Sequence, residues 1–174
     1  MENLLNWSRS QLQGYKPNSH SHSLKNISNQ VIQTLSAQAA QKGINLIDHI
    51  APDATVYADA DMTELIMRNI VANAIKFTPN NGVIELNTSL TENQTTFSVS
   101  DNGVGITAQL VEQLNSTDTS QHTPTQLGTN KEKGTGLGLM LCKAFTTLMK
   151  GEILVTSEVG KGSVIFVTLP KLAS

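Results

Sequence analysis

Several residue types are scarce in this sequence of 174 residues, and each scarcity excludes a class of protein. Cys142 is the single cysteine, so an internal disulfide and a cysteine-rich metal site are excluded, and a reducing compartment is indicated. No apolar run approaches the roughly 20 residues of a membrane-spanning helix, and the N-terminus lacks a signal-peptide pattern. With a net charge of −2 and a pI near 6.0, the chain has no basic excess for nucleic acid or an anionic membrane. We expect it to contact neither.

The sequence does contain enough apolar material for one globular domain, because 39% of its residues are hydrophobic. Residues 1–13 are predicted to form a helix. The polar stretch 14–23, with Gly, Pro and Asn, is predicted to be a linker. The domain itself is expected over residues 24–174.

Apolar periodicity predicts the secondary structure of this domain. Helices are predicted over 24–43, from the capping pair Asp61 and Glu64 onward, over 106–115 and over 137–150, and strands over 44–50, 55–58, 82–90, 94–101, 151–158 and 163–170. Residues 115–133 have no periodicity, which is typical of a functional lid or a disordered loop. The pattern predicts an α/β (α+β) two-layer sandwich, with helices packed on one face of a mixed, mostly antiparallel sheet.

One predicted helix carries polar residues where a buried helix would be apolar. In "RNIVANAIKFTPNNG" (68–82), Asn69, Asn73 and Lys76 fall within one narrow arc of the helical wheel. The rest of the surface is mostly apolar, and is formed by Ile66, Ile70, Val71, Ala74 and Ile75. The stripe could simply face solvent. Alternatively it lines a cleft, where amide oxygens suit Mg²⁺ and an ammonium group suits phosphate.

A second polar group follows a predicted strand in "SVSDNGVGI" (98–106). Strand alternation places Asp101 on the same face as Phe97 and Val99, so the carboxylate points toward the core and needs a hydrogen-bond donor. Gly103 and Gly105 allow a flat ligand to approach the backbone, and the amine of adenine is a fitting donor. A plain Asx-turn is the alternative, because Asp-Asn-Gly is a strong turn signal.

A third stretch, "EKGTGLGLML" (132–141), is rich in glycine at the start of a helix. Gly134, Gly136 and Gly138 leave backbone amides accessible to an anion, and Lys133 adds positive charge beside them. The spacing matches neither a Walker A loop nor a dinucleotide-binding fingerprint. By itself the stretch indicates a phosphate site only weakly.

Together, in this order, the three stretches resemble the N box, G1 box and G2 box of the GHKL ATPase and kinase superfamily. They are most similar to the ATP-binding catalytic domain of sensor histidine kinases. "NIVANAIKFT" resembles the N box, "DNGVGI" the G1 box, and "GTNKEKGTGLGLMLCKAF" the lid end, the G2 box and the following helix. "GKGSVIFVTLP" resembles the closing strand, and "NLLNWSRSQL" the end of a dimerisation-domain helix that remains at residues 1–13. The resemblance covers roughly residues 24–170 and implies a Bergerat-type ATP-binding fold.

The resemblance also implies a role for individual residues, with ATP and Mg²⁺ as cofactors. Asn69, Asn73 and Lys76 would be the catalytic residues, and Asn73 would bind the metal. Phe77 would stack near adenine, and Asp101 would accept a hydrogen bond from the adenine amine. The implied nucleotide-binding set is Phe77, Asp101, Gly103, Gly105, Ile106, Lys133, Gly134, Thr135, Gly136, Leu137, Gly138 and Leu139.

Within the superfamily, Asn69 separates histidine kinases from the hydrolases and from the related serine kinases, which also keep a glutamate there. Gyrase-type, mismatch-repair and heat-shock chaperone ATPases have a glutamate at this place, four residues before the metal-binding asparagine. That glutamate activates water. An asparagine cannot act as a general base. A histidine kinase does not need this base, because the acceptor imidazole is itself a nucleophile near neutral pH. The alternatives are a non-catalytic nucleotide-binding regulatory module and a GHKL ATPase.

The acceptor histidine of such a kinase is normally followed by an acidic residue on a dimerisation helix. None of His20, His22, His49 and His122 is followed by an acidic residue, so we expect the acceptor to lie outside this chain. The implied partners are the dimerisation and phosphoacceptor domain of the same protein and the receiver domain of a response regulator. We expect a cytoplasmic location in a bacterium, with a parent protein that could be membrane-anchored.

Overall fold

The computed structural model describes residues 16–116, 129 and 138–172. The predicted helix at residues 1–13 and most of the predicted lid at 115–133 lie outside the described residues. In chain order the elements are β1 (His20–Ser23), α2 (Leu24–Gln41), β2 (Asn45–His49), β3 (Thr55–Ala58), α3 (Ala60–Phe77), β4 (Val83–Leu90), β5 (Gln94–Asp101), α4 (Ala108–Asn115), α5 (Gly138–Leu148), β6 (Glu152–Glu158) and β7 (Gly162–Pro170). None of the helices in these ranges is long and apolar enough to cross a bilayer.

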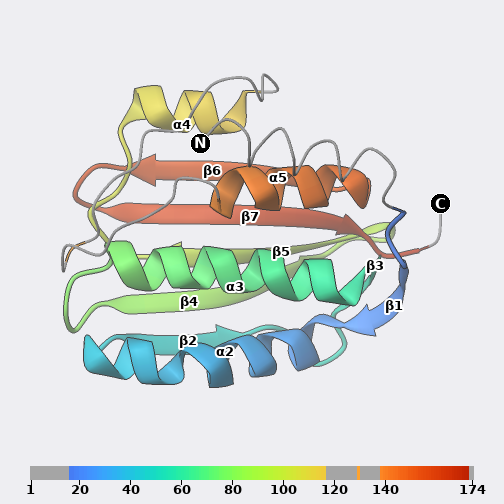
Figure 1. Cartoon of the computed structure of the whole chain (residues 1–174), viewed down its shortest axis with the longest axis horizontal. Coiled ribbons are helices and arrows are strands. Elements are labelled where there is room, and N and C mark those ends of the chain that lie inside the picture. Colours follow the sequence, from blue (N-terminus) through green and yellow to red (C-terminus); the bar gives the residue numbers. More distant parts are fainter. Residues whose placement is uncertain (1–15, 117–128, 130–137, 173–174) are drawn as a thin grey trace.

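The strands form two sheets (Figure 1). The five-stranded sheet has the order β2-β4-β5-β7-β6, with β2 parallel to β4 and every other neighbouring pair antiparallel. β1 and β3 form a separate two-stranded antiparallel sheet. α2, α3 and α5 lie side by side over one face of the large sheet, and α4 lies beside the edge strand β6 (Figure 1). The predicted two-layer sandwich with a mixed, mostly antiparallel sheet is therefore confirmed.

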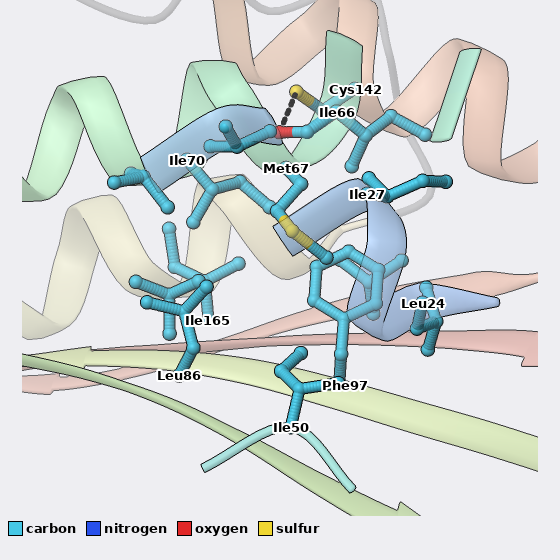
Figure 2. Close-up of a cluster of buried hydrophobic side chains, with 14 of the residues drawn as sticks. Leu24, Ile27, Ile50, Ile66, Met67, Ile70, Leu86, Phe97, Cys142 and Ile165 are labelled. Atoms are coloured by element: carbon cyan, nitrogen blue, oxygen red, sulfur yellow. Dashed lines mark hydrogen bonds between the residues drawn. The ribbon is translucent and has the colours of Figure 1, made fainter. Parts of the chain in front are cut away.

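The core lies between the three helices and the large sheet. Figure 2 shows Phe97 of β5 reaching up from the sheet toward Met67 of α3, and both side chains are fully buried. The predicted apolar faces of α3 are confirmed, because five residues on them are at most 5% exposed: Ile66, Ile70, Val71, Ala74 and Ile75. Cys142 of α5 packs against α3, and its thiol contacts the carbonyl oxygen of Ile66 at 3.8 Å (Figure 2). Burial raises the pKa of this thiol to about 12, so it is an inert part of the core.

The predicted linker is shorter in the structure than in the sequence analysis. Residues 20–23 form β1, in which His20 pairs with Ala58 and Ser23 with Thr55. The polar sequence gives no strand pattern, because the backbone hydrogen bonds of an edge strand do not require apolar side chains. Ser23 then caps α2, since its side chain accepts from the backbone N–H of Asn26 at 3.3 Å.

The start of α3 also differs from the sequence analysis, which placed the cap at Asp61. The N-cap is Asp59, whose Oδ1 accepts from the N–H of Met62 at 3.1 Å, while Asp61 lies exposed in the first turn. Both aspartates precede an apolar helical run, so the local sequence alone does not distinguish them. Asp59 is selected because its Oδ2 also accepts from the N–H of Asn18 at 2.8 Å, a contact 41 residues distant in sequence.

Candidate functional site

The polar stripe of α3 consists of side chains with different degrees of burial. Asn69 and Asn73 are half-buried, and Lys76 is buried, with 9% of its surface exposed. Residues three and four positions apart are neighbours on a helix surface, so the three side chains form one row. Asn69 Nδ2 donates to the carbonyl oxygen of Leu65 at 3.0 Å. The stripe is therefore not simply facing solvent, as one of the two sequence interpretations required.

The start of α5 lies against this row. A Cβ atom on Gly138 would be 3.3 Å from Asn69 Oδ1, so little space separates the first residue of α5 from the asparagine. The first N–H groups of a helix have no intrahelical partner and carry partial positive charge, which makes this end suited to an anion. Leu139 is the next residue of α5. The other predicted residues of this stretch lie outside the described residues: Lys133, Gly134, Thr135, Gly136 and Leu137.

Asp101 is the last residue of β5 and is half-buried. Its alternation with Phe97 and Val99, both buried, agrees with the sequence prediction. Gly103 N donates to Asp101 Oδ1 at 2.8 Å, and the N–H of Ser163 also donates to the carboxyl group. Burial raises the pKa of Asp101 above its ordinary value, and these two hydrogen bonds oppose the shift only in part. Among the described residues no ion pair to Asp101 is present.

The contact between Asp101 and Gly103 spans two residues, so the Asx-turn that the sequence offered as an alternative is present. This turn does not exclude a ligand. A carboxyl group has two oxygens with about four acceptor sites, and the turn uses only one N–H donor on Oδ1. The group is thus held in one orientation and keeps capacity for a further donor.

The loop after β5 is joined to the end of α3. Val104 N donates to the carbonyl oxygen of Phe77 at 3.1 Å. A Cβ atom on Gly103 would lie 2.6 Å from that same oxygen and 2.6 Å from Asp101 Oδ1, so only glycine allows this approach. Lys76 Nζ lies 4.7 Å from the centre of the Phe77 ring, within the range of a cation–π interaction. Two stretches predicted to act together are therefore in direct contact.

The other side of this loop is joined to the turn between β6 and β7. Gly105 has a φ of +71°, and a Cβ atom there would lie 2.1 Å from the carbonyl oxygen of Glu158. Ile106 N donates to Ser157 Oγ at 2.8 Å, and Gly160 N donates to the carbonyl oxygen of Val104 at 2.9 Å. The predicted residues Gly103, Gly105 and Ile106 thus lie in a loop with contacts on both sides.

Two polar residues near this site were not predicted from the sequence. Lys42, which follows α2, is buried, and its Nζ lies 2.8 Å from the carbonyl oxygen of Ile75. Thr129 N donates to the carbonyl oxygen of Lys76 at 3.0 Å. A lysine at a helix end and a threonine in a polar stretch are ordinary features, so the sequence offered no signal for either contact.

A model of the family described as histidine kinase-, DNA gyrase B- and HSP90-like ATPases matches residues 58–173. The match spans more than half of the chain, and the chain belongs to this family. An uncharacterized sensor-like histidine kinase of Rhizobium meliloti is 35% identical over 141 residues, which cover 80% of this chain and 26% of the relative. Sporulation kinase E of Bacillus subtilis is 35% identical over 144 residues, which cover 80% of this chain and 18% of the relative. The chain thus spans about a quarter or less of these two relatives.

Solved structures show the same fold. The catalytic domain of histidine kinase ThkA has a TM-score of 0.74 and 24% identity, with 88% of this chain and 96% of that domain covered. Full-length ShkA, solved in complex with AMPPNP, has a TM-score of 0.76 and 24% identity, with 92% of this chain and 33% of that protein covered. At these identities the likeness concerns the fold alone.

Proposed function

We propose that this chain is the ATP-binding catalytic domain of a two-component sensor histidine kinase. The whole protein would transfer the γ-phosphoryl group of ATP to a histidine of its dimerisation domain, for relay to an aspartate of a response regulator. Membership in the ATPase family and likeness to histidine kinases support this proposal. Such a domain works where ATP is available, which supports a cytoplasmic location.

The observation that supports the proposal most is the position of the half-buried carboxyl group of Asp101. It stands at the start of a loop that is hydrogen-bonded to the end of α3 through Val104 N and the carbonyl oxygen of Phe77. Asp101 would accept a hydrogen bond from the exocyclic amine of adenine. Gly103 and Gly105 would serve this site by letting the loop pack against the carbonyl oxygens of Phe77 and Glu158, which a Cβ atom at either glycine would prevent. Phe77, which is in contact with this loop, would contribute an aromatic face.

The phosphate groups would lie along the α3 row. Lys76 would contact phosphate oxygens, and the N-terminus of α5 beside Asn69 would add partial positive charge. Asn73 would hold Mg²⁺. The described residues contain no cluster of three or more histidine, cysteine or acidic side chains that could hold a metal ion by themselves. Mg²⁺ commonly takes one or two protein ligands together with phosphate oxygens and water, so Asn73 would be one ligand among several. Mg²⁺ would neutralise charge on the transferring phosphoryl group.

The side chains of α3 are better suited to a histidine kinase than to a hydrolase. Asn69 occupies the place where the related hydrolases have a glutamate, and its Nδ2 is already bonded to the carbonyl oxygen of Leu65 at 3.0 Å. An amide in this position has no basic atom to take a proton from water. In a histidine kinase the acceptor imidazole attacks the phosphoryl group directly, so the missing base does not prevent transfer.

Nucleotide titrations of the unaltered chain, Asp101→Asn and Asn73→Ala test the site. Asp101→Asn replaces an ionised acceptor by a neutral group of the same shape, so we expect ATP and adenosine to bind about 10- to 100-fold more weakly. Asn73→Ala should weaken ATP about tenfold in the presence of Mg²⁺, and leave adenosine within about twofold. Asn29→Ala, at an exposed position of α2, is the matched control and should bind like the unaltered chain.

Phosphotransfer separates the remaining alternatives. The chain is mixed with a separately produced dimerisation domain that carries the acceptor histidine, and with ATP labelled at the γ-phosphate. A labelled histidine is the expected result. Nucleotide binding without labelling would favour a non-catalytic module, and steady release of phosphate by the chain alone would favour an ATPase. In the titrations, equal nucleotide affinity of the unaltered chain, Asp101→Asn, Asn73→Ala and Asn29→Ala would contradict the proposed site.

A further inference from the structure

Lys42 is a buried lysine outside the predicted site, with 6% of its surface exposed. Its Nζ donates to the carbonyl oxygens of Ile75 at 2.8 Å and Lys76 at 3.1 Å, and to Thr129 Oγ1 at 2.6 Å. Lysine is almost never buried unless its ammonium group is satisfied by partners. Two of the three partners here are the carbonyl oxygens of consecutive residues in the last turn of α3.

The last carbonyls of an α-helix have no partner within the helix. In α3 the carbonyl of Ile75 accepts from Lys42, and the carbonyl of Lys76 accepts from Lys42 and from Thr129. The carbonyl of Phe77 accepts from Val104 N. We use the name α3 C-terminal cluster for the five residues Lys42, Lys76, Phe77, Val104 and Thr129. Donors from three separate parts of the chain therefore meet at one helix end.

The charge of Lys42 suits this place. The C-terminal end of a helix carries partial negative charge, and a cation in a partly buried position there is more stabilising than at a surface. The ammonium group also has three donors, which match the two carbonyls and the threonine hydroxyl. A neutral side chain could satisfy some of these acceptors but would not provide the charge.

We propose that Lys42 is a positioning residue for nucleotide binding, which holds the last turn of α3 so that Lys76 can reach the phosphate groups. This inference rests on the proposed function of Lys76. Lys42 Nζ donates to the backbone carbonyl oxygen of Lys76 itself. Loss of the Lys42 ammonium group would therefore release the backbone of Lys76, whose own side chain lies over the Phe77 ring. The effect should fall on phosphate binding more than on adenine binding, because Asp101 is held by β5 and by Gly103 N.

The alternative is that Lys42 only stabilises the fold. The two roles are separated by the ratio of affinities for ATP with Mg²⁺ and for adenosine, which has no phosphate. Loss of general stability would change both affinities in proportion, or neither at a temperature where the protein is folded. Loss of positioning would change the ratio.

The test compares Lys42→Met, which keeps an unbranched apolar side chain without the charge, with Lys42→Arg, which keeps the charge. The matched control is Lys25→Met at the start of α2, the helix that Lys42 follows, and it removes the 2.8 Å ion pair between Lys25 and Asp48. Lys25 and Lys42 are 17 positions apart, or about 25 Å along a helix, so the control lies far from the cluster. Affinities are measured by calorimetric titration below the unfolding temperature of each variant.

We expect Lys42→Met to weaken ATP about tenfold and adenosine less than twofold, since one charged hydrogen bond to phosphate is worth at least this factor. Lys42→Arg should recover most of the loss, and Lys25→Met should leave the ratio unchanged. In Lys42→Met combined with Lys76→Met, the two losses should not add, because both act through one ammonium–phosphate contact. If Lys42→Met does not fold, the same ratio is measured on Lys42→Gln, with an expected change of at least about threefold.

The results distinguish failure of this inference from failure of the proposed function. An unchanged ratio in the uncharged variants, with normal ATP binding by the unaltered chain, would overturn the positioning role alone. Losses that add fully in the combined variant would also overturn it. Absence of ATP binding by the unaltered chain would overturn the proposed function and this inference with it.

Discussion

The two ends of α3 are stabilised in different ways. At the N-terminal end, Asp59 Oδ1 accepts from the N–H of Met62, three residues away. At the C-terminal end, the carbonyl of Lys76 accepts from Lys42 and Thr129, which are 34 and 53 residues away. The first end thus has one cap, Asp59, which is itself held by a single distant donor, the N–H of Asn18, whereas the second end receives donors from three distant parts of the chain, at Lys42, Val104 and Thr129. A helix end that joins several distant segments can align a site, whereas an end capped by one side chain chiefly stabilises the helix.

The largest effect is expected from a change at the C-terminal end. In Gly103→Ala the new Cβ atom would lie 2.6 Å from the carbonyl oxygen of Phe77, so the loop after β5 must move. We expect the free energy of unfolding to fall by about 2 kcal/mol, as for overpacked sites, and ATP affinity to fall more than tenfold. Urea denaturation and nucleotide titration measure the two effects.

Gly160→Ala provides the comparison for this variant. Gly160 has a φ of +80°, and a Cβ atom there would meet nothing within 4 Å. We expect a loss of about 1 kcal/mol from the left-handed backbone alone, with ATP affinity kept within about twofold. If Gly103→Ala also kept its ATP affinity, the contact between the loop and α3 would not matter for binding.

A smaller effect is expected at the N-terminal end. Asp59→Ala removes the cap of α3 and should lower the free energy of unfolding by about 1 kcal/mol, without changing the ATP-to-adenosine affinity ratio. Asp61→Ala, at the exposed position that the sequence suggested as the cap, should change stability by less than about 0.5 kcal/mol. A larger loss in Asp61→Ala than in Asp59→Ala would contradict the observed cap.

The smallest effect concerns pH. The pKa of Asp101 is raised above its ordinary value of 3.8 by burial, so the folded state holds the proton of this group more tightly than the unfolded state does. The stability that this group contributes is present below pH 3.8 and is lost as the pH rises through the raised pKa. The free energy of unfolding of the unaltered chain, relative to Asp101→Asn, should therefore fall over this range in urea denaturation. A relative rise with pH would contradict the burial of the carboxyl group.

The comparison between the two helix ends also explains what sequence reasoning could predict. The sandwich could be predicted from periodicity, because Phe97 and Val99 of β5 alternate with polar residues and the apolar residues of α3 repeat at helical spacing. The strand β1 was not predicted, and the cap of α3 was placed at Asp61 instead of Asp59, since both features depend on contacts made by the polar residues 18–23. The role of Lys42 could not be predicted at all, because a lone lysine has no pattern and its partners are carbonyls 33 and 34 residues away.

Amide NMR mapping of a titration with ATP and Mg²⁺ tests most directly whether the C-terminal half of α3, the loop after β5 and the start of α5 form one nucleotide site. We expect the largest shift changes at residues 69–77, 101–106 and 138–139, while the N–H groups of Met62 and Thr63 at the other end of α3 change little. Shift changes concentrated at the N-terminal end of α3, or none at saturating nucleotide, would contradict this site.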